Sequence, residues 1–148
     1  MRLAFSRFGT LLASAIVTVF ACSSATADVT LPNIFGNSMV LQRDQQNPVW
    51  GKAAPGEQVT VSVDAQKHST TADDKGNWRV VLEPLAVGAP KELVINGKNE
   101  VRFNDVLVGE VWICSGQSNM QWSVNNATNF ALEAPAANFP AIRMINFP

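Results

Sequence analysis

Apolar and polar residues alternate along much of the chain between residues 28 and 106. Val59, Val61 and Val63 are separated by single polar residues, which is the period of a strand with one buried face. The same reasoning predicts strands at residues 39–41, 48–50, 66–72, 78–82, 92–95 and 101–103, with turns at 55–56, 73–77 and 96–99. Short strands separated by such turns predict an N-terminal β-sandwich, Ig-like or jelly-roll-like, over residues 28–106, with the polar strand 66–72 at an edge.

The pattern changes near residue 106. Residues 106–114 are almost continuously apolar, which predicts a strand buried on both faces, as in a parallel sheet covered by helices. Residues 121–137 predict a loop with a short helix, and residues 142–145 predict a second strand. Because strand, helix and strand are the opening of an α/β domain, we expect residues 107–148 to be the truncated start of one.

Residues 1–27 have the pattern of an export signal. Arg2 and Arg7 precede an apolar run over residues 11–21, and small residues at 25–27 form a cleavage pattern. The alternatives are a membrane anchor or a buried helix, and lipid attachment at Cys22 is a poorer match because Phe20 is bulky. We therefore expect export to the periplasm or outside the cell, without stable membrane insertion after cleavage.

Composition narrows the function classes. The net charge is -1, 16% of residues are charged, and no run of like charge is present, which argues against nucleic-acid binding. After signal removal only Cys114 remains, so no internal disulfide is expected, and we expect this thiol to be buried. Asp73, Asp74 and Asn77 superficially resemble a calcium loop but lack its terminal glutamate, so a plain turn is expected. The sequence predicts no metal site and no cofactor, and it leaves the oligomeric state open.

Ser118 is the leading candidate for chemistry. It follows the apolar run and Gly116, so a serine hydroxyl at the carboxyl edge of a sheet is expected, although such stretches are also ordinary loops. Gln117, Asn119 and Trp122 flank it and are candidates for a substrate pocket, with Asn119 alternatively capping a helix. The other tryptophans, at positions 50, 78 and 112, lie in strand-like contexts that favour core packing.

A longer motif surrounds this serine. Residues 109–120 (GEVWICSGQSNM) resemble the first sequence block of the sialate O-acetylesterase family of SGNH-type serine esterases. Residues 31–43, 48–51 and 55–57 resemble that family's N-terminal β-sandwich region, so the likeness runs from about residue 29 to the end of the chain. The resemblance implies a flavodoxin-like α/β domain after the sandwich. It also implies deacetylation of O-acetylated sugars, typically sialic acids, with Ser118 as nucleophile and its backbone N–H as an oxyanion donor.

The chain departs from the family pattern after Ser118. A complete member has a glycine and an asparagine as further oxyanion donors and a later Asp-x-x-His pair, and none of these blocks follows here. The only histidine, His68, lies in the predicted edge strand and is expected at the surface rather than in catalysis. We therefore expect an N-terminal fragment of an esterase that is inactive alone. The alternative is a noncatalytic secreted β-sandwich module that binds glycan or protein.

Overall fold

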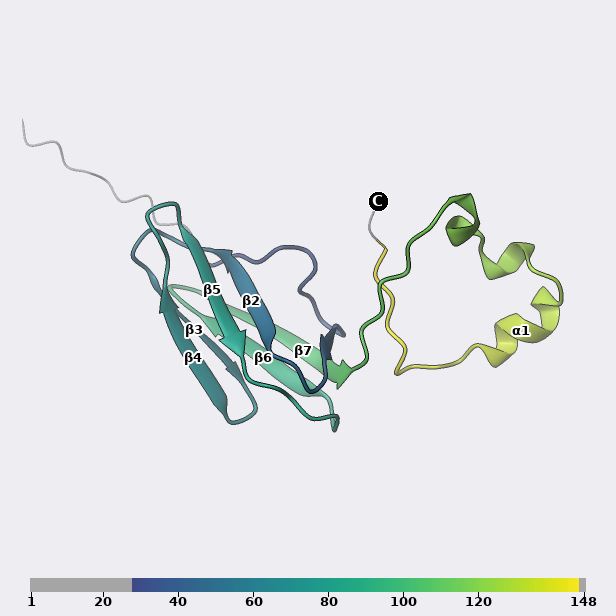
Figure 1. The fold of residues 1–148 in the computed structure, drawn as a ribbon. Helices are drawn as coiled ribbons and strands as arrows, with labels where there is room; N and C mark the ends of the chain where they lie inside the picture. Colours follow the sequence, from purple (N-terminus) through teal and green to yellow (C-terminus); the bar gives the residue numbers. More distant parts are fainter. Residues whose placement is uncertain (1–27, 147–148) are drawn as a thin grey trace, which may run out of the picture.

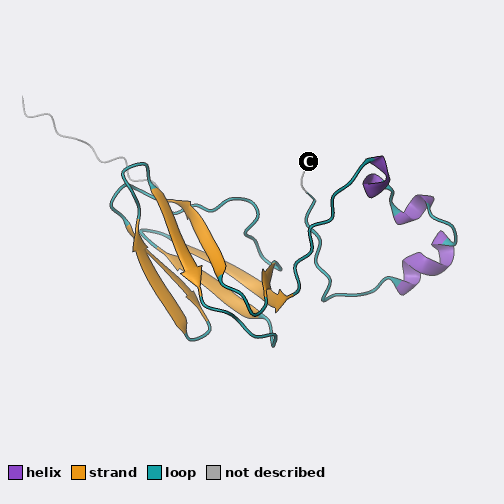
Figure 2. Ribbon diagram, viewed as in Figure 1, coloured by secondary structure: helices purple, strands orange, loops and turns teal. Residues whose placement is uncertain are grey.

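The computed structural model describes residues 28–146, which are mostly β (Figures 1 and 2). The predicted export signal and the lipidation variant at Cys22 lie outside the described residues. The strands are β1 (Val40–Gln42), β2 (Asn47–Lys52), β3 (Gln58–Val63), β4 (Gln66–Thr71), β5 (Asn77–Leu82), β6 (Lys91–Asn96) and β7 (Glu100–Gly109). The helical elements are two 3₁₀ turns, η1 (Ser118–Gln121) and η2 (Val124–Asn126), and one short helix, α1 (Phe130–Ala136).

Two sheets enclose one apolar core. The larger is a curled, mixed sheet of five strands in the order β1-β7-β6-β3-β4, in which only the β1–β7 pairing is parallel. The smaller pairs β2 with β5 antiparallel and lies over the larger one (Figure 1). The core consists mainly of valine, leucine and isoleucine from alternate strand positions, including Val49, Val59, Val61, Leu82, Leu93 and Ile95. The predicted β structure of residues 28–106 is therefore confirmed in part, as a curled five-strand sheet with a two-strand sheet over it.

The local predictions in this part hold in detail. Val59, Val61 and Val63 are buried while their neighbours along β3 are not. The polar strand β4 lies at the edge of the larger sheet. The Asn-Gly turn joins β6 to β7 as a hairpin, with Asn96 paired to Glu100. Alternation and turn chemistry thus suffice for these elements, because β3 buries one face and the turn residues act locally.

The segment before β1 packs against β2. Thr30 and Lys52 form a backbone bridge in which each N–H donates to the other carbonyl, at 2.8 and 2.9 Å. Gly51 makes this approach possible, since a Cβ there would lie 2.0 Å from the Thr30 oxygen and 2.9 Å from the Trp78 ring. The residues at 28–32 consequently border the small sheet.

The predictions for the C-terminal part are corrected in three places. The strand expected at residues 106–114 ends at Gly109, as the last part of β7, and residues 110–116 form no strand. Residues 142–145 form no strand either, and Cys114 is exposed rather than buried. A strand buried on both faces needs neighbours on both sides, and residues 28–146 supply none beyond Gly109. Only the short helix predicted within residues 121–137 is present, as α1.

No helix among residues 28–146 is long and apolar enough to cross a membrane.

Candidate functional site

Ser118 is the first residue of η1 and lies on the surface of the C-terminal segment. Gln117 precedes it with an extended backbone (φ -87°, ψ -165°), and its carbonyl accepts the Met120 N–H at 2.9 Å. Among the described residues, neither the Ser118 hydroxyl nor its backbone N–H has a hydrogen-bond partner. The nucleophile candidate and a neighbouring donor are therefore both open to a ligand.

Gly116 shapes this loop by close approach and not by an unusual backbone angle. The φ angle of Gly116 is not in the positive range, so the expected tight turn after the apolar run does not depend on a left-handed conformation. A Cβ at this position would instead lie 2.7 Å from Cγ of Met120. The glycine thus lets the Met120 side chain fold back against the backbone at position 116.

The predicted pocket residues are not gathered into a pocket by the described part of the chain. Gln117, Asn119 and Trp122 are all exposed, and Trp122 has 64% of its surface accessible. The only link among them is the Trp122 N–H donating to the Asn119 carbonyl at 3.2 Å. Asn119 lies inside η1 and caps no helix, since the residues that precede η2 and α1 are Ser123 and Asn129.

Of the three tryptophans expected in the core, only one is buried. Trp78 is buried, as predicted, with 3% of its surface accessible. Trp112 is 82% exposed because its expected strand does not form, and Trp50 is 38% exposed, so core packing is wrong for both. Trp50 follows buried Val49 in β2, and the period of two places it on the outer face. The two-residue period, counted from Val49, was the signal that could have identified Trp50 as a surface aromatic.

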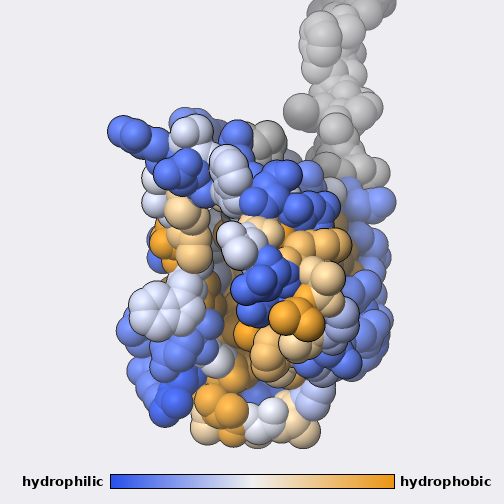
Figure 3. Space-filling model, turned by 90° about the vertical axis from the view of Figure 1, so that its right-hand side faces the viewer, coloured by the Kyte–Doolittle hydropathy of each residue, from blue (hydrophilic) through white to orange (hydrophobic). Residues whose placement is uncertain are grey.

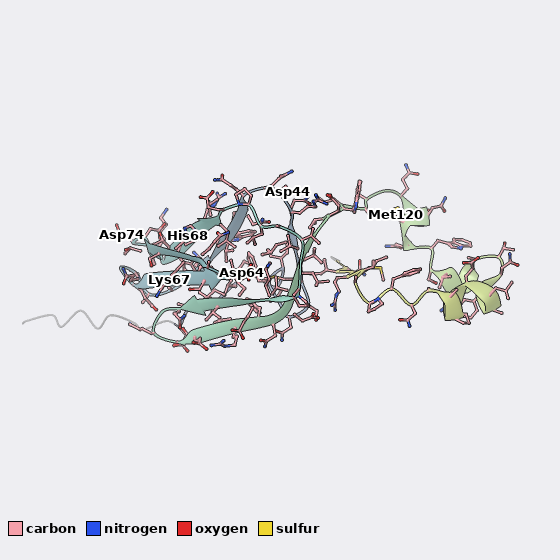
Figure 4. All side chains as sticks on the ribbon, turned by 90° about the horizontal axis from the view of Figure 1, so that it is seen from below. Asp44, Asp64, Lys67, His68, Asp74 and Met120 are labelled. Carbon is pink, nitrogen blue, oxygen red and sulfur yellow. The ribbon has the colours of Figure 1, made fainter. Side chains whose placement is uncertain are left out.

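No base reaches Ser118 within residues 28–146. His68 lies in β4, half-buried, with its Nε2 3.2 Å from the Gln66 amide oxygen. Figure 4 shows His68 and Met120, the latter in the same turn as Ser118, at opposite ends of the molecule. The described residues therefore present a serine without the group that would take its proton.

Polar contacts attach the start of the C-terminal segment to β1. The Gln42 side-chain oxygen accepts the Val111 N–H at 2.8 Å, and its amide nitrogen donates to Glu110 at 3.1 Å. The Arg43 N–H donates to the Gly109 carbonyl at 2.9 Å. The path of the chain toward Ser118 is thus set by contacts with the β part.

In the acidic turn after β4, the Asp73 carboxylate forms hydrogen bonds with other residues of the same turn. Asp73 accepts hydrogen bonds from the Asn77 side chain and from the N–H groups of Lys75 and Asn77, each at 2.8 Å. The Asn77 side chain foremost, then these N–H groups, holds the pKa of Asp73 below its ordinary value. Residues 28–146 contain no group of three or more His, Cys, Asp or Glu side chains that could hold a metal ion.

Together these features define a β-rich module continued by an exposed segment with an accessible serine turn. The chain is homologous to sialate O-acetylesterases and to a structurally characterised carbohydrate acetylesterase. It is 33% identical over 141 residues to the sialate O-acetylesterases of Homo sapiens and Pongo abelii, covering 86% of this chain and 27% of each relative. It is 37% identical over 123 residues to the Mus musculus protein, covering 74% of this chain and 23% of that relative.

The structural match agrees with the sequence matches. The crystal structure of a carbohydrate acetylesterase from Xanthomonas citri aligns with a TM-score of 0.74 and 39% identity. The alignment covers 76% of this chain and 26% of the acetylesterase. No protein-family model matches the chain. The chain thus spans about a quarter of the length of the proteins it matches.

Proposed function

We propose that the chain is part of a carbohydrate O-acetylesterase in which Ser118 is the nucleophile and the substrate is an O-acetylated sugar such as a sialic acid. The observation that carries the proposal is the homology to sialate O-acetylesterases over 86% of the chain. A continuous match of that extent leaves out only residues near the two ends, so it includes Ser118. The accessible hydroxyl of Ser118 supports the assignment.

In this reaction the Ser118 hydroxyl attacks the acetyl carbonyl while a base takes its proton. The carbonyl oxygen becomes an oxyanion, which the unpaired Ser118 N–H is free to stabilise. The sugar hydroxyl then leaves with a proton, and an acetyl-enzyme remains. Water attacks this ester, and acetate and free serine are released.

The base and the remaining oxyanion donors belong, in this proposal, to parts of the esterase outside these 148 residues. The sequence has one histidine, His68, and that residue lies in β4. We expect the 148-residue chain alone to have no measurable turnover. Residues 28–106 act as a β-sandwich module and residues 107–148 as the start of an SGNH-type α/β domain.

The surface of the C-terminal segment supports that division. Figure 3 faces the end of the molecule that carries this segment, and apolar side chains are spread over it. Those most exposed include Trp112, Ile113, Leu132, Phe139 and Met144. Apolar surface of this extent is typical of an interface, and further strands and helices of an α/β domain would cover it.

A chimera tests the proposal. Residues 28–148 replace the matching quarter of the Xanthomonas citri acetylesterase, and hydrolysis of 4-nitrophenyl acetate and of an O-acetylated sialic acid is measured. We expect turnover in the chimera that falls about 10³-fold or more in Ser118→Ala. The matched control Ser115→Ala, three positions earlier in the same exposed segment, should retain activity.

Two outcomes oppose the proposal. If the chimera folds and Ser118→Ala leaves its turnover unchanged, Ser118 is not the nucleophile. Turnover by the unfused 148-residue chain that disappears in Ser118→Ala contradicts the assignment of the base to other residues. A fluorophosphonate label on Ser118 in the chimera, absent from the unfused chain, is the expected chemical signature.

A further inference from the structure

A groove runs along the outer side of the small sheet. Trp50 of β2 lies directly opposite Arg79 of β5, and Lys52 lies opposite Asn77. All four side chains are exposed, whereas Gly51 between them is buried. Together with the segment at residues 30–32, they line a hollow of about 790 Å³.

Trp50 gives this groove a fixed aromatic wall. Phe35 meets its ring edge-to-face, with centroids 4.9 Å apart and planes at 77°. The ring nevertheless keeps 38% of its surface accessible. A second hollow, of about 200 Å³ and lined in part by Phe35 and Val111, lies against the same side chain. An accessible indole that packs against a second ring is suited to contact with the apolar C–H face of a sugar ring.

The groove carries two positive charges, those of Lys52 and Arg79. Neither Lys52 nor Arg79 forms an ion pair within residues 28–146. Lys52 instead donates to the Asn77 side-chain oxygen and to the Lys75 carbonyl. The carboxylate of Asp73 is near enough for the Lys52 charge to help lower its pKa, while its hydrogen bonds stay within its own turn. Two cations beside an aromatic wall complement an anionic ligand.

We propose that this groove is a noncatalytic binding site for an acidic saccharide. The sugar ring packs against Trp50, and its carboxylate accepts hydrogen bonds from Arg79 and Lys52. The site belongs to the β part of the chain and uses no residue of the Ser118 turn. It therefore stands or falls separately from the esterase proposal.

Titration of the 148-residue chain with N-acetylneuraminic acid, followed by ¹H–¹⁵N NMR, tests the site. We expect saturable shifts at the Trp50 indole and at the Arg79 amide. Trp50→Ala should abolish the shift at the Arg79 amide, and Arg79→Gln should weaken binding about fivefold, the size typical of an exposed charge contact. Raising the salt concentration should lower the affinity of the wild type by a larger factor than that of Arg79→Gln.

Matched controls separate the groove from general surface effects. Trp122→Ala changes an exposed tryptophan in the C-terminal segment, and Lys67→Gln changes an exposed cation on β4. Both should bind like the wild type, as should Ser118→Ala, which disables only the proposed esterase. Arg79→Gln alters an exposed side chain, so its spectrum should remain that of the folded chain.

Three results would overturn the proposal. The first is absence of saturable shifts with the wild type. The second is wild-type affinity in Trp50→Ala or in Arg79→Gln. The third is equal affinity for neutral N-acetylmannosamine, which would remove the role assigned to the two cations.

Discussion

Asp105 and Arg143 form an ion pair that returns the end of the C-terminal segment to the β part. The guanidinium nitrogen lies 2.9 Å from Oδ2 of Asp105, and the same oxygen accepts the Ser38 hydroxyl at 2.8 Å. The contact of Val111 with Gln42 holds the other end of the segment. Residues 111–143, which include the serine turn, are therefore fastened at both ends to the β part.

Replacing Arg143 should release one of these ends. We expect Arg143→Gln to lower the ¹⁵N order parameters of residues 140–146, because the pair with Asp105 is lost. The free energy of unfolding should change by only about 0–1 kcal/mol, as for other partly exposed pairs. Arg102→Gln is the control, since Arg102 pairs with Glu92 and Glu100 on β6 and β7. Unchanged order parameters in Arg143→Gln would show that the ion pair does not hold the segment.

Strand positions in the β part were predictable because burial there is one-sided. Buried side chains alternate with half-buried or exposed ones in β3 and with exposed ones in β5. The sequence therefore shows which face of each strand points into the core. The hairpin at residues 96–99 was predictable for a different reason, since Asn-Gly favours the backbone angles of a tight turn. Both signals are local and need no knowledge of distant residues.

The region after Gly109 was not predictable in this way. Val111, Trp112 and Ile113 form an apolar run, and such a run indicates burial without saying which residues provide it. Among residues 28–146 nothing covers them, so no strand forms. The same ambiguity misplaced Trp112 and Cys114, which were expected in the interior and are exposed.

The candidate site was only partly accessible to sequence reasoning. The motif around Ser118 singles out this serine as the candidate nucleophile, but the motif carries no information on where a base lies. The Trp50 groove was missed because a tryptophan in a strand was assigned to the core by its neighbours' hydrophobicity. The groove depends on the register between β2 and β5, which places Arg79 beside Trp50. That register is set by how the two strands pair and cannot be read from the sequence of either strand alone.

Export is predicted to remove residues 1–27. Expression of the full chain in a bacterium with a secretory pathway should yield a periplasmic or secreted product that begins at Asp28, because small residues at 25–27 match a cleavage site. N-terminal sequencing and intact mass measure this directly. Replacing Ala25 and Ala27 with leucine should block processing. An unprocessed chain in the cytoplasm would contradict the prediction.

Gly51→Ala should destabilise the β part. The new Cβ would meet the Thr30 carbonyl and the Trp78 ring at distances that real atoms do not tolerate, so the bridge between Thr30 and Lys52 must shift. We expect a loss of about 1–3 kcal/mol in the free energy of unfolding, measured by urea denaturation. Gly36→Ala is the matched control, because a Cβ there meets nothing within 4 Å. Equal stability of the two variants would contradict the close packing at Gly51.

The Asp73 turn should respond to acid in a defined direction. Hydrogen bonds, chiefly from the Asn77 side chain, lower the pKa of Asp73 from its ordinary value of 3.8. A lowered pKa in the folded state means that the carboxylate stabilises the fold at pH values above 3.8. This contribution is lost as the pH falls through the pKa of the folded state. NMR titration of the Asp73 side-chain carbon should therefore give a midpoint below 3.8.

Asn77→Ala removes the largest cause of that shift, so the midpoint of Asp73 should rise toward 3.8. The stability of the variant should also depend less on pH below this value, because its folded and unfolded states then bind protons more equally. Asp74→Asn is the control, since Asp74 accepts none of the hydrogen bonds that hold Asp73. A midpoint that is the same in the wild type and in Asn77→Ala would mean that the turn's hydrogen bonds do not favour the ionised carboxylate.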